Sequence, residues 1–91
     1  MRLEARPSSD GRFAFSPTEL TAPQHGAIVV EFDNRTSAPH TLVFLEPIDR
    51  RSGVIVDPGG HDRLAFTTPG PGTYRFVCTV HEDMAGVLIV R

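Results

Sequence analysis

The sequence of 91 residues lacks tryptophan, and it has a single cysteine, Cys78. One cysteine excludes an internal disulfide framework. The net charge is −2 and no basic block is present, which argues against nucleic-acid binding. No apolar run approaches the about 18 residues that a membrane-spanning helix needs. No apolar segment follows residues 1–6, so the pattern of a signal peptide is missing, and we expect either a cytoplasmic protein or a mature or excised domain.

What the chain does contain is typical of short strands joined by turns. Hydrophobic residues make up 40%, with six Phe, and the eight Gly and eight Pro fall in clusters between apolar runs. No stretch keeps a helical period over three turns. The sequence therefore predicts one domain over residues 1–91, an all-β Greek-key β-sandwich of seven to eight antiparallel strands. Seven strands are expected over residues 12–16, 27–33, 40–45, 53–57, 61–67, 73–78 and 86–91. Residues 18–22 are a candidate continuation of the first of these strands, and residues 3–6 are a candidate short edge strand.

Two of these strands place polar donors at the rim of the expected core. With a period of two, His40 shares a face with Leu42 and Phe44. In the same way, Cys78 shares a face with Tyr74 and Phe76. If the aromatic and aliphatic residues face the core, His40 and Cys78 face it too, at its edge.

Cys78, His81 and Met84 follow the pattern C-x2-H-x2-M, which puts a thiolate, an imidazole and a thioether on one short loop. His40 is the leading candidate for a fourth donor. Two His, one Cys and a weak Met is the ligand set of a blue-copper electron-transfer site. Zinc is the main rival metal, although zinc sites seldom use Met. A buried Cys without a metal would be an inert core residue.

The same residues carry a family resemblance that extends over nearly the whole chain. Residues 69–81 resemble the cupredoxin signature G-x-Y-x-F-x-C-x-x-H, residues 84–90 its M-x-G turn and last strand, and residues 34–40 its loop before the first ligand. The chain is thus similar to cupredoxins of the plastocyanin and amicyanin group. Thr41 and Thr79 stand where this family commonly has a linking Asn and its partner, and a hydroxyl pair could replace that link. Val80 stands where Pro is frequent.

The resemblance implies copper at one end of the sandwich, with His40, Cys78, His81 and Met84 as ligands and His81 as the electron port. The expected function is that of a small soluble type 1 copper protein, not an enzyme, that carries single electrons between redox partners. The partners, of cytochrome, oxidase or dehydrogenase type, would dock near His81. A monomer on the periplasmic or extracellular side of a membrane is expected from the resemblance.

Other roles fit parts of the same evidence. A copper-carrier domain or an excised module of a larger redox enzyme is the alternative, and a metal-free β-sandwich used for binding is a third reading. Glu82 and Asp83 are either solvated loop residues or an acidic edge that attracts a basic partner. His25 and His61 lie in Gly/Pro turns and are expected to be exposed.

Overall fold

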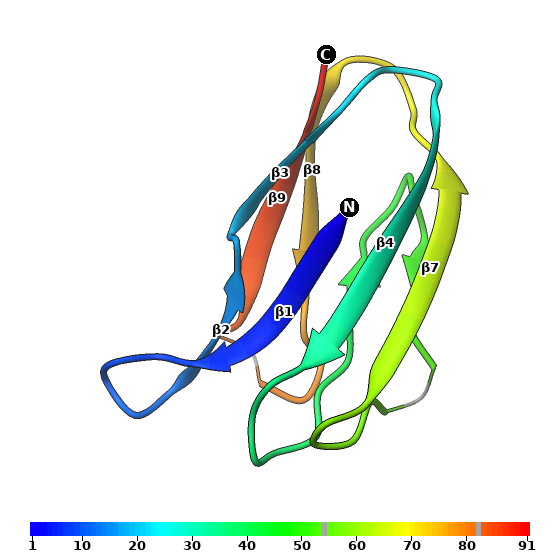
Figure 1. Cartoon of the computed structure of the whole chain (residues 1–91). Coiled ribbons are helices and arrows are strands. Elements are labelled where there is room, and N and C mark those ends of the chain that lie inside the picture. The colour runs from blue at the N-terminus through cyan, green and yellow to red at the C-terminus, as the bar shows by residue number, and fades with distance from the viewer. Residues whose placement is uncertain (54, 82) are drawn as a thin grey trace.

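The computed structural model describes residues 1–53, 55–81 and 83–91. Across these residues the chain forms nine strands and no helix (Figure 1). The described residues therefore contain no helix that could cross a membrane. The strands are β1 (Arg2–Pro7), β2 (Phe13–Ser16), β3 (Glu19–Ala22), β4 (Ala27–Asn34), β5 (Val43–Phe44), β6 (Arg50–Arg51), β7 (His61–Thr67), β8 (Gly72–Val77) and β9 (Ala85–Val90).

The strands form two sheets that pack face to face, in the orders β2-β1-β4-β7 and β3-β9-β8-β5-β6. This confirms the all-β sandwich, but both sheets are mixed. β1 pairs in parallel with β4, and β3 in parallel with β9, because the chain visits the other sheet before it returns beside an earlier strand. The expected edge position of residues 3–6 is also wrong, since β1 lies between β2 and β4.

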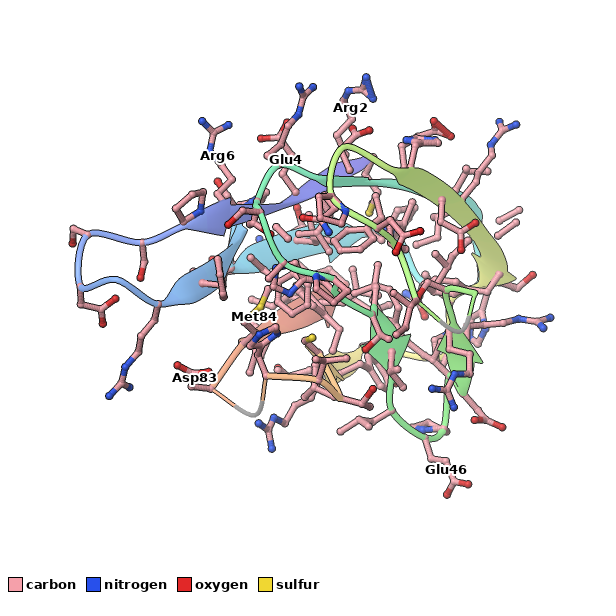
Figure 2. The ribbon with its side chains drawn as sticks, turned by 90° about the horizontal axis from the view of Figure 1, so that it is seen from below. Arg2, Glu4, Arg6, Glu46, Asp83 and Met84 are labelled. Atoms are coloured by element: carbon pink, nitrogen blue, oxygen red, sulfur yellow. The ribbon has the colours of Figure 1, made fainter. Side chains whose placement is uncertain are left out.

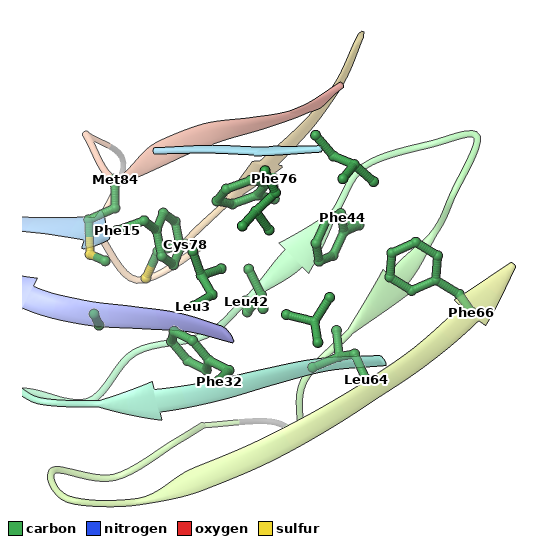
Figure 3. Packing of buried hydrophobic residues seen from close by; sticks show 14 of the residues in the cluster. Leu3, Phe15, Phe32, Leu42, Phe44, Leu64, Phe66, Phe76, Cys78 and Met84 are labelled. Carbon is green, nitrogen blue, oxygen red and sulfur yellow. The ribbon is translucent and has the colours of Figure 1, made fainter. Parts of the chain in front are cut away.

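The alternation of buried and more exposed residues along β4 shows why such a segment forms a strand of a sandwich. Val30 and Phe32 are fully buried, whereas Glu31 and Asp33, which alternate with them, point to the outer face. Burying a large apolar side chain contributes about 1.5–3 kcal/mol, so the register that places this face inward is strongly favoured. The core between the sheets runs from Cys78, Met84 and Phe15 at one end to Phe66 at the other (Figure 3).

The expected strand over residues 40–45 is regular only in β5. His40 makes an isolated bridge with Val56, and the Leu42 N–H donates to the Ser52 side-chain hydroxyl (3.0 Å) instead of to a strand carbonyl. This side-chain bond interrupts the ladder. The expected strand over residues 53–57 is accordingly reduced to the bridge at Val56, while residue 54 lies outside the described part. Between the expected strands over residues 40–45 and 53–57, where we expected no strand, the chain forms the short strand β6.

The outer face of the first sheet carries alternating charges. Arg2, Glu4 and Arg6 project from β1 away from the core (Figure 2). Glu31 of β4 pairs with Arg63 of β7 at 2.9 Å, and such cross-strand pairs of opposite charge stabilise a sheet modestly.

Among the connections at the lower end of the sandwich in Figure 1, three bear on the predicted donors. They are the β1–β2 hairpin, the loop that follows β4, and the loop between β8 and β9. His40 ends the second connection, and Cys78, His81 and Met84 belong to the third. The fold therefore brings all four predicted donors to one end of the core.

Candidate metal centre

His40, Cys78 and His81 come together at this end of the sandwich. One donor atom from each side chain, the Cys78 Sγ and a ring nitrogen of each His, lies within 4.8 Å of the others. The Cys78 Sγ is 3.8 Å from the His40 Nδ1 and 3.9 Å from the His81 Nδ1. His40 and Cys78 are buried, while His81 is half-buried. The rim position predicted for His40 and Cys78 is confirmed.

The loop between β8 and β9 is closed by its own backbone. The Met84 N–H donates to the His81 carbonyl (3.0 Å), and the Cys78 N–H donates to the Met84 carbonyl (3.1 Å). This turn folds Met84 back toward Cys78, and Met84 is fully buried. Figure 3 shows both sulfur atoms at the same end of the core. A thioether thus lies beside the cluster of thiol and imidazoles.

Hydrogen bonds behind His40 fix its ring. The His40 Nε2 lies 2.7 Å from the Thr36 hydroxyl oxygen. That oxygen is 2.8 Å from the Asn34 Oδ1 and 3.0 Å from the Ala38 carbonyl. The Thr36 hydroxyl donates to one of these acceptors, so it accepts from a protonated Nε2. This tautomer leaves the Nδ1 lone pair directed toward Cys78, as a metal ligand requires.

Electrostatics favour the same neutral ring. Burial, followed by the nearby His81, holds the pKa of His40 below its ordinary value. Burial disfavours the charged imidazolium because it removes water from the charge. His40 is therefore poised to offer an unprotonated nitrogen near neutral pH.

Thr41 supports the sulfur. Its N–H points at the Cys78 Sγ (3.5 Å), and its hydroxyl is 3.8 Å from the same sulfur. The Thr41 hydroxyl also lies 2.8 Å from the Thr79 hydroxyl and accepts the Thr79 N–H at 2.9 Å. The hydroxyl pair that we expected to replace the Asn link is thus present. It ties the segment that leads from His40 into β5 to the loop that starts at Cys78.

Contacts from remote segments complete the site, and none of them was predicted from the sequence. The Phe13 ring packs edge-on against both imidazoles, with centroids 5.0 Å from His40 and 5.1 Å from His81. Asp83 pairs with Arg12 at 3.6 Å, which offsets part of the negative charge of the acidic edge that we considered. Glu82 lies outside the described residues. Asn34 and Thr36 were likewise missed as supports of His40.

The chemistry of these donors fits a type 1 copper site. Copper in its two oxidation states takes thiolate, imidazole and a weak thioether, and zinc seldom uses Met. The fit rests on a thiol and two imidazoles that already converge, with a buried methionine next to them. The expected ligand types are all present at one end of the fold.

Comparison with known proteins agrees with this geometry. Residues 8–90 match the cupredoxin-like domain family. The chain belongs to this family. No curated protein sequence matches this cupredoxin.

Solved structures reproduce the fold over the full length of the cupredoxin. Auracyanin A, a blue copper protein from Chloroflexus aurantiacus, superposes with a TM-score of 0.84 at 20% identity, covering 100% of this chain and 97% of the other. A reduced auracyanin from Roseiflexus castenholzii gives 0.78 at 25% identity, covering 99% and 94%. A reduced Cu(I) form of an amicyanin mutant gives 0.72 at 20% identity, covering 100% and 81%. At these identities the likeness shows the fold.

Proposed function

We propose that this cupredoxin is a single copper-binding domain, residues 1–91, that carries one electron at a time between redox partners. His40, Cys78 and His81 would hold the copper ion, with Met84 as a fourth, weaker ligand. The observation that carries the proposal is the convergence of the three donor atoms within 4.8 Å. Copper bound there would supply the Cu(I)/Cu(II) couple.

The chain's own residues serve this role by holding the ligands still. Thr36 fixes the His40 ring, and the Thr41 N–H supports the Cys78 sulfur. Electron transfer is fast when the ligands move little between oxidation states, and a stiff sheet edge with fixed hydrogen bonds limits such movement. Among the described residues, the side chains that bond or stack with the donors are Thr36, Thr41 and Phe13, none of which is an acid or base. This supports a carrier over a catalyst.

His81 is the proposed route for the electron, because it is the half-exposed donor. Beside it Val80 is 45% exposed, which offers an apolar surface against which a redox protein can dock. We further propose that the protein is a monomer and works outside the cytoplasm; both proposals rest on the family resemblance. Replacing Val80 with Asp should slow electron self-exchange, measured by NMR line broadening, without changing the visible spectrum.

The ligand set is tested by loading the protein with Cu(II) and recording its visible and EPR spectra. We expect an intense thiolate-to-copper charge-transfer band that disappears on one-electron reduction and is absent from Cys78→Ser. His25→Gln is the control, because His25 is exposed and should leave the band unchanged. A copper-loaded oxidised protein without the band, or a band retained in Cys78→Ser, contradicts the proposal.

A further inference from the structure

We propose that the β1–β2 hairpin, residues 7–13, is a clasp that holds His81 in place before any metal binds, with Phe13 as its positioning residue. This inference deepens the proposed function and rests on it for its purpose. The contacts themselves belong to the metal-free chain, so they can be tested without copper.

Phe13 touches the two imidazoles at the same time. Its ring meets His40 at 74° and His81 at 67°, the edge-to-face geometry that aromatic rings prefer. The two imidazoles are themselves 4.7 Å apart between centroids. Phe13 therefore limits how far the His81 ring can turn away from His40.

A second contact ties the residue before β2 to the same loop. The Arg12 guanidinium lies 3.6 Å from the Asp83 carboxylate, and Asp83 lies between His81 and Met84 in the sequence. Figure 2 shows Asp83 on the side of the loop that faces the hairpin. Both groups are largely exposed, at 69% and 47%, so this pair is the weaker half of the clasp.

The hairpin is rigid enough to act as a support. The Ser8 N–H donates to the Arg12 carbonyl (2.8 Å), and the Gly11 N–H donates to the Ser8 carbonyl (3.2 Å). The Arg12 N–H is capped by the Asp10 carboxylate (3.1 Å). Gly11 has a φ of +83°, which glycine adopts without strain. From this turn the chain enters β2, whose partner β1 is hydrogen-bonded on both sides.

His81 needs such a support more than the other donors do. His40 has the Thr36 hydroxyl behind it and Cys78 has Thr41 beside it. Within the described residues, the hydrogen-bonding and ring–ring contacts of the His81 side chain are those with Cys78, His40 and Phe13. Phe13 is thus the contact from outside the donor cluster that fixes this ring.

The experiment measures how fast Ellman's reagent reacts with the buried Cys78 thiol in the metal-free protein. Opening of the loop exposes the sulfur, so the rate reports the loop's closed fraction. Phe13→Leu should raise the rate about two- to tenfold, and Arg12→Gln should raise it about twofold. Phe13→Tyr keeps the aromatic ring, so its reaction rate should lie within about twofold of that of the original protein.

Phe66→Leu is the matched control, because Phe66 packs on Phe44 at the opposite end of the core. Arg6→Gln is the control for the ion pair, since Arg6 pairs with Glu4 on β1. Both controls should leave the thiol rate unchanged. A rate raised equally by Phe66→Leu, or a Phe13→Leu rate equal to that of the original protein, overturns the clasp. Absence of the charge-transfer band in the loaded protein would instead overturn the proposed function.

Discussion

Replacing Thr36 with valine removes the hydroxyl oxygen that lies 2.7 Å from the His40 Nε2. His40 is fully buried and Thr36 is 8% exposed, so water has little access to the freed nitrogen. Leaving a buried polar group unpaired costs about 1–3 kcal/mol. A chain of this length has a total stability of about 5–14 kcal/mol, so the metal-free protein should unfold at clearly lower urea concentration.

The same change should weaken copper binding. Without its partner on Nε2, the His40 ring is no longer fixed in the tautomer and orientation that point Nδ1 at Cys78. Loss of such a supporting bond typically lowers metal affinity by about 10–100-fold, which equals about 1.4–2.7 kcal/mol. Urea unfolding followed by circular dichroism gives the first quantity, and competition for Cu(I) with a calibrated chelator gives the second.

Two controls separate ligand support from general stability. Thr36→Ser keeps the hydroxyl and should retain most of the copper affinity. Thr68→Val removes a buried hydroxyl at the opposite end, where the Thr68 oxygen accepts the Gly26 N–H (2.9 Å). That variant should lose stability but bind copper as before. If Thr36→Val kept the original copper affinity, or if Thr68→Val lost as much of it, the role assigned to Thr36 would be refuted.

Three further outcomes are expected. Thr41→Val removes the hydroxyl near the Cys78 sulfur and should lower the reduction potential by tens of millivolts. A hydrogen bond worth about 1 kcal/mol corresponds to about 43 mV for one electron. An unchanged potential in voltammetry would show that the hydroxyl does not act on the sulfur. Gly86→Ala should destabilise the fold by about 1–3 kcal/mol or more, since its Cβ would lie 2.3 Å from the Phe76 ring; equal urea midpoints would contradict this. The hydrogen bond from His61 is the main cause that holds the pKa of Asp33 below its ordinary 3.8. The stabilisation from this pair is therefore present above that pH and is lost as the pH falls through the lowered pKa. Asp33→Asn should make the free energy of unfolding depend less on pH in acid, and an unchanged pH dependence would argue against the pair.

The four donors could be predicted from sequence because their signals are local. Three of them share one loop, and a period of two brings His40 to the rim of the core. The break in the expected strand over residues 40–45 could not be predicted, because it comes from His40, Thr41 and Leu42 all being buried in succession. Thr41 points inward to reach Cys78 and Thr79, and this tertiary contact overrides the alternation.

The residues that support the imidazoles could not be found from the sequence for a related reason. Phe13, Asn34 and Thr36 read as ordinary strand and loop residues, and only the folded chain places them behind the imidazoles. The two parallel pairings are similar: alternation says which face a strand buries, but not which distant strand lies beside it. Local chemistry was therefore readable, whereas pairings between remote segments were not.

The position of β9 sets the order of events when the protein is made. β9 is the last strand of this chain, yet it lies inside its sheet, hydrogen-bonded to both β3 and β8. Until β9 emerges from the ribosome, the loop that contains Cys78 and His81 is not held at its far end. The Met84 carbonyl, which accepts the Cys78 N–H in the folded chain, then has no fixed position. A nascent chain could therefore offer a reactive thiol before it offers a shaped site. We expect correct metal loading to follow the emergence of β9 and its pairing with β3 and β8, and a chain truncated before β9 to be vulnerable at that thiol to oxidation or to a misplaced metal.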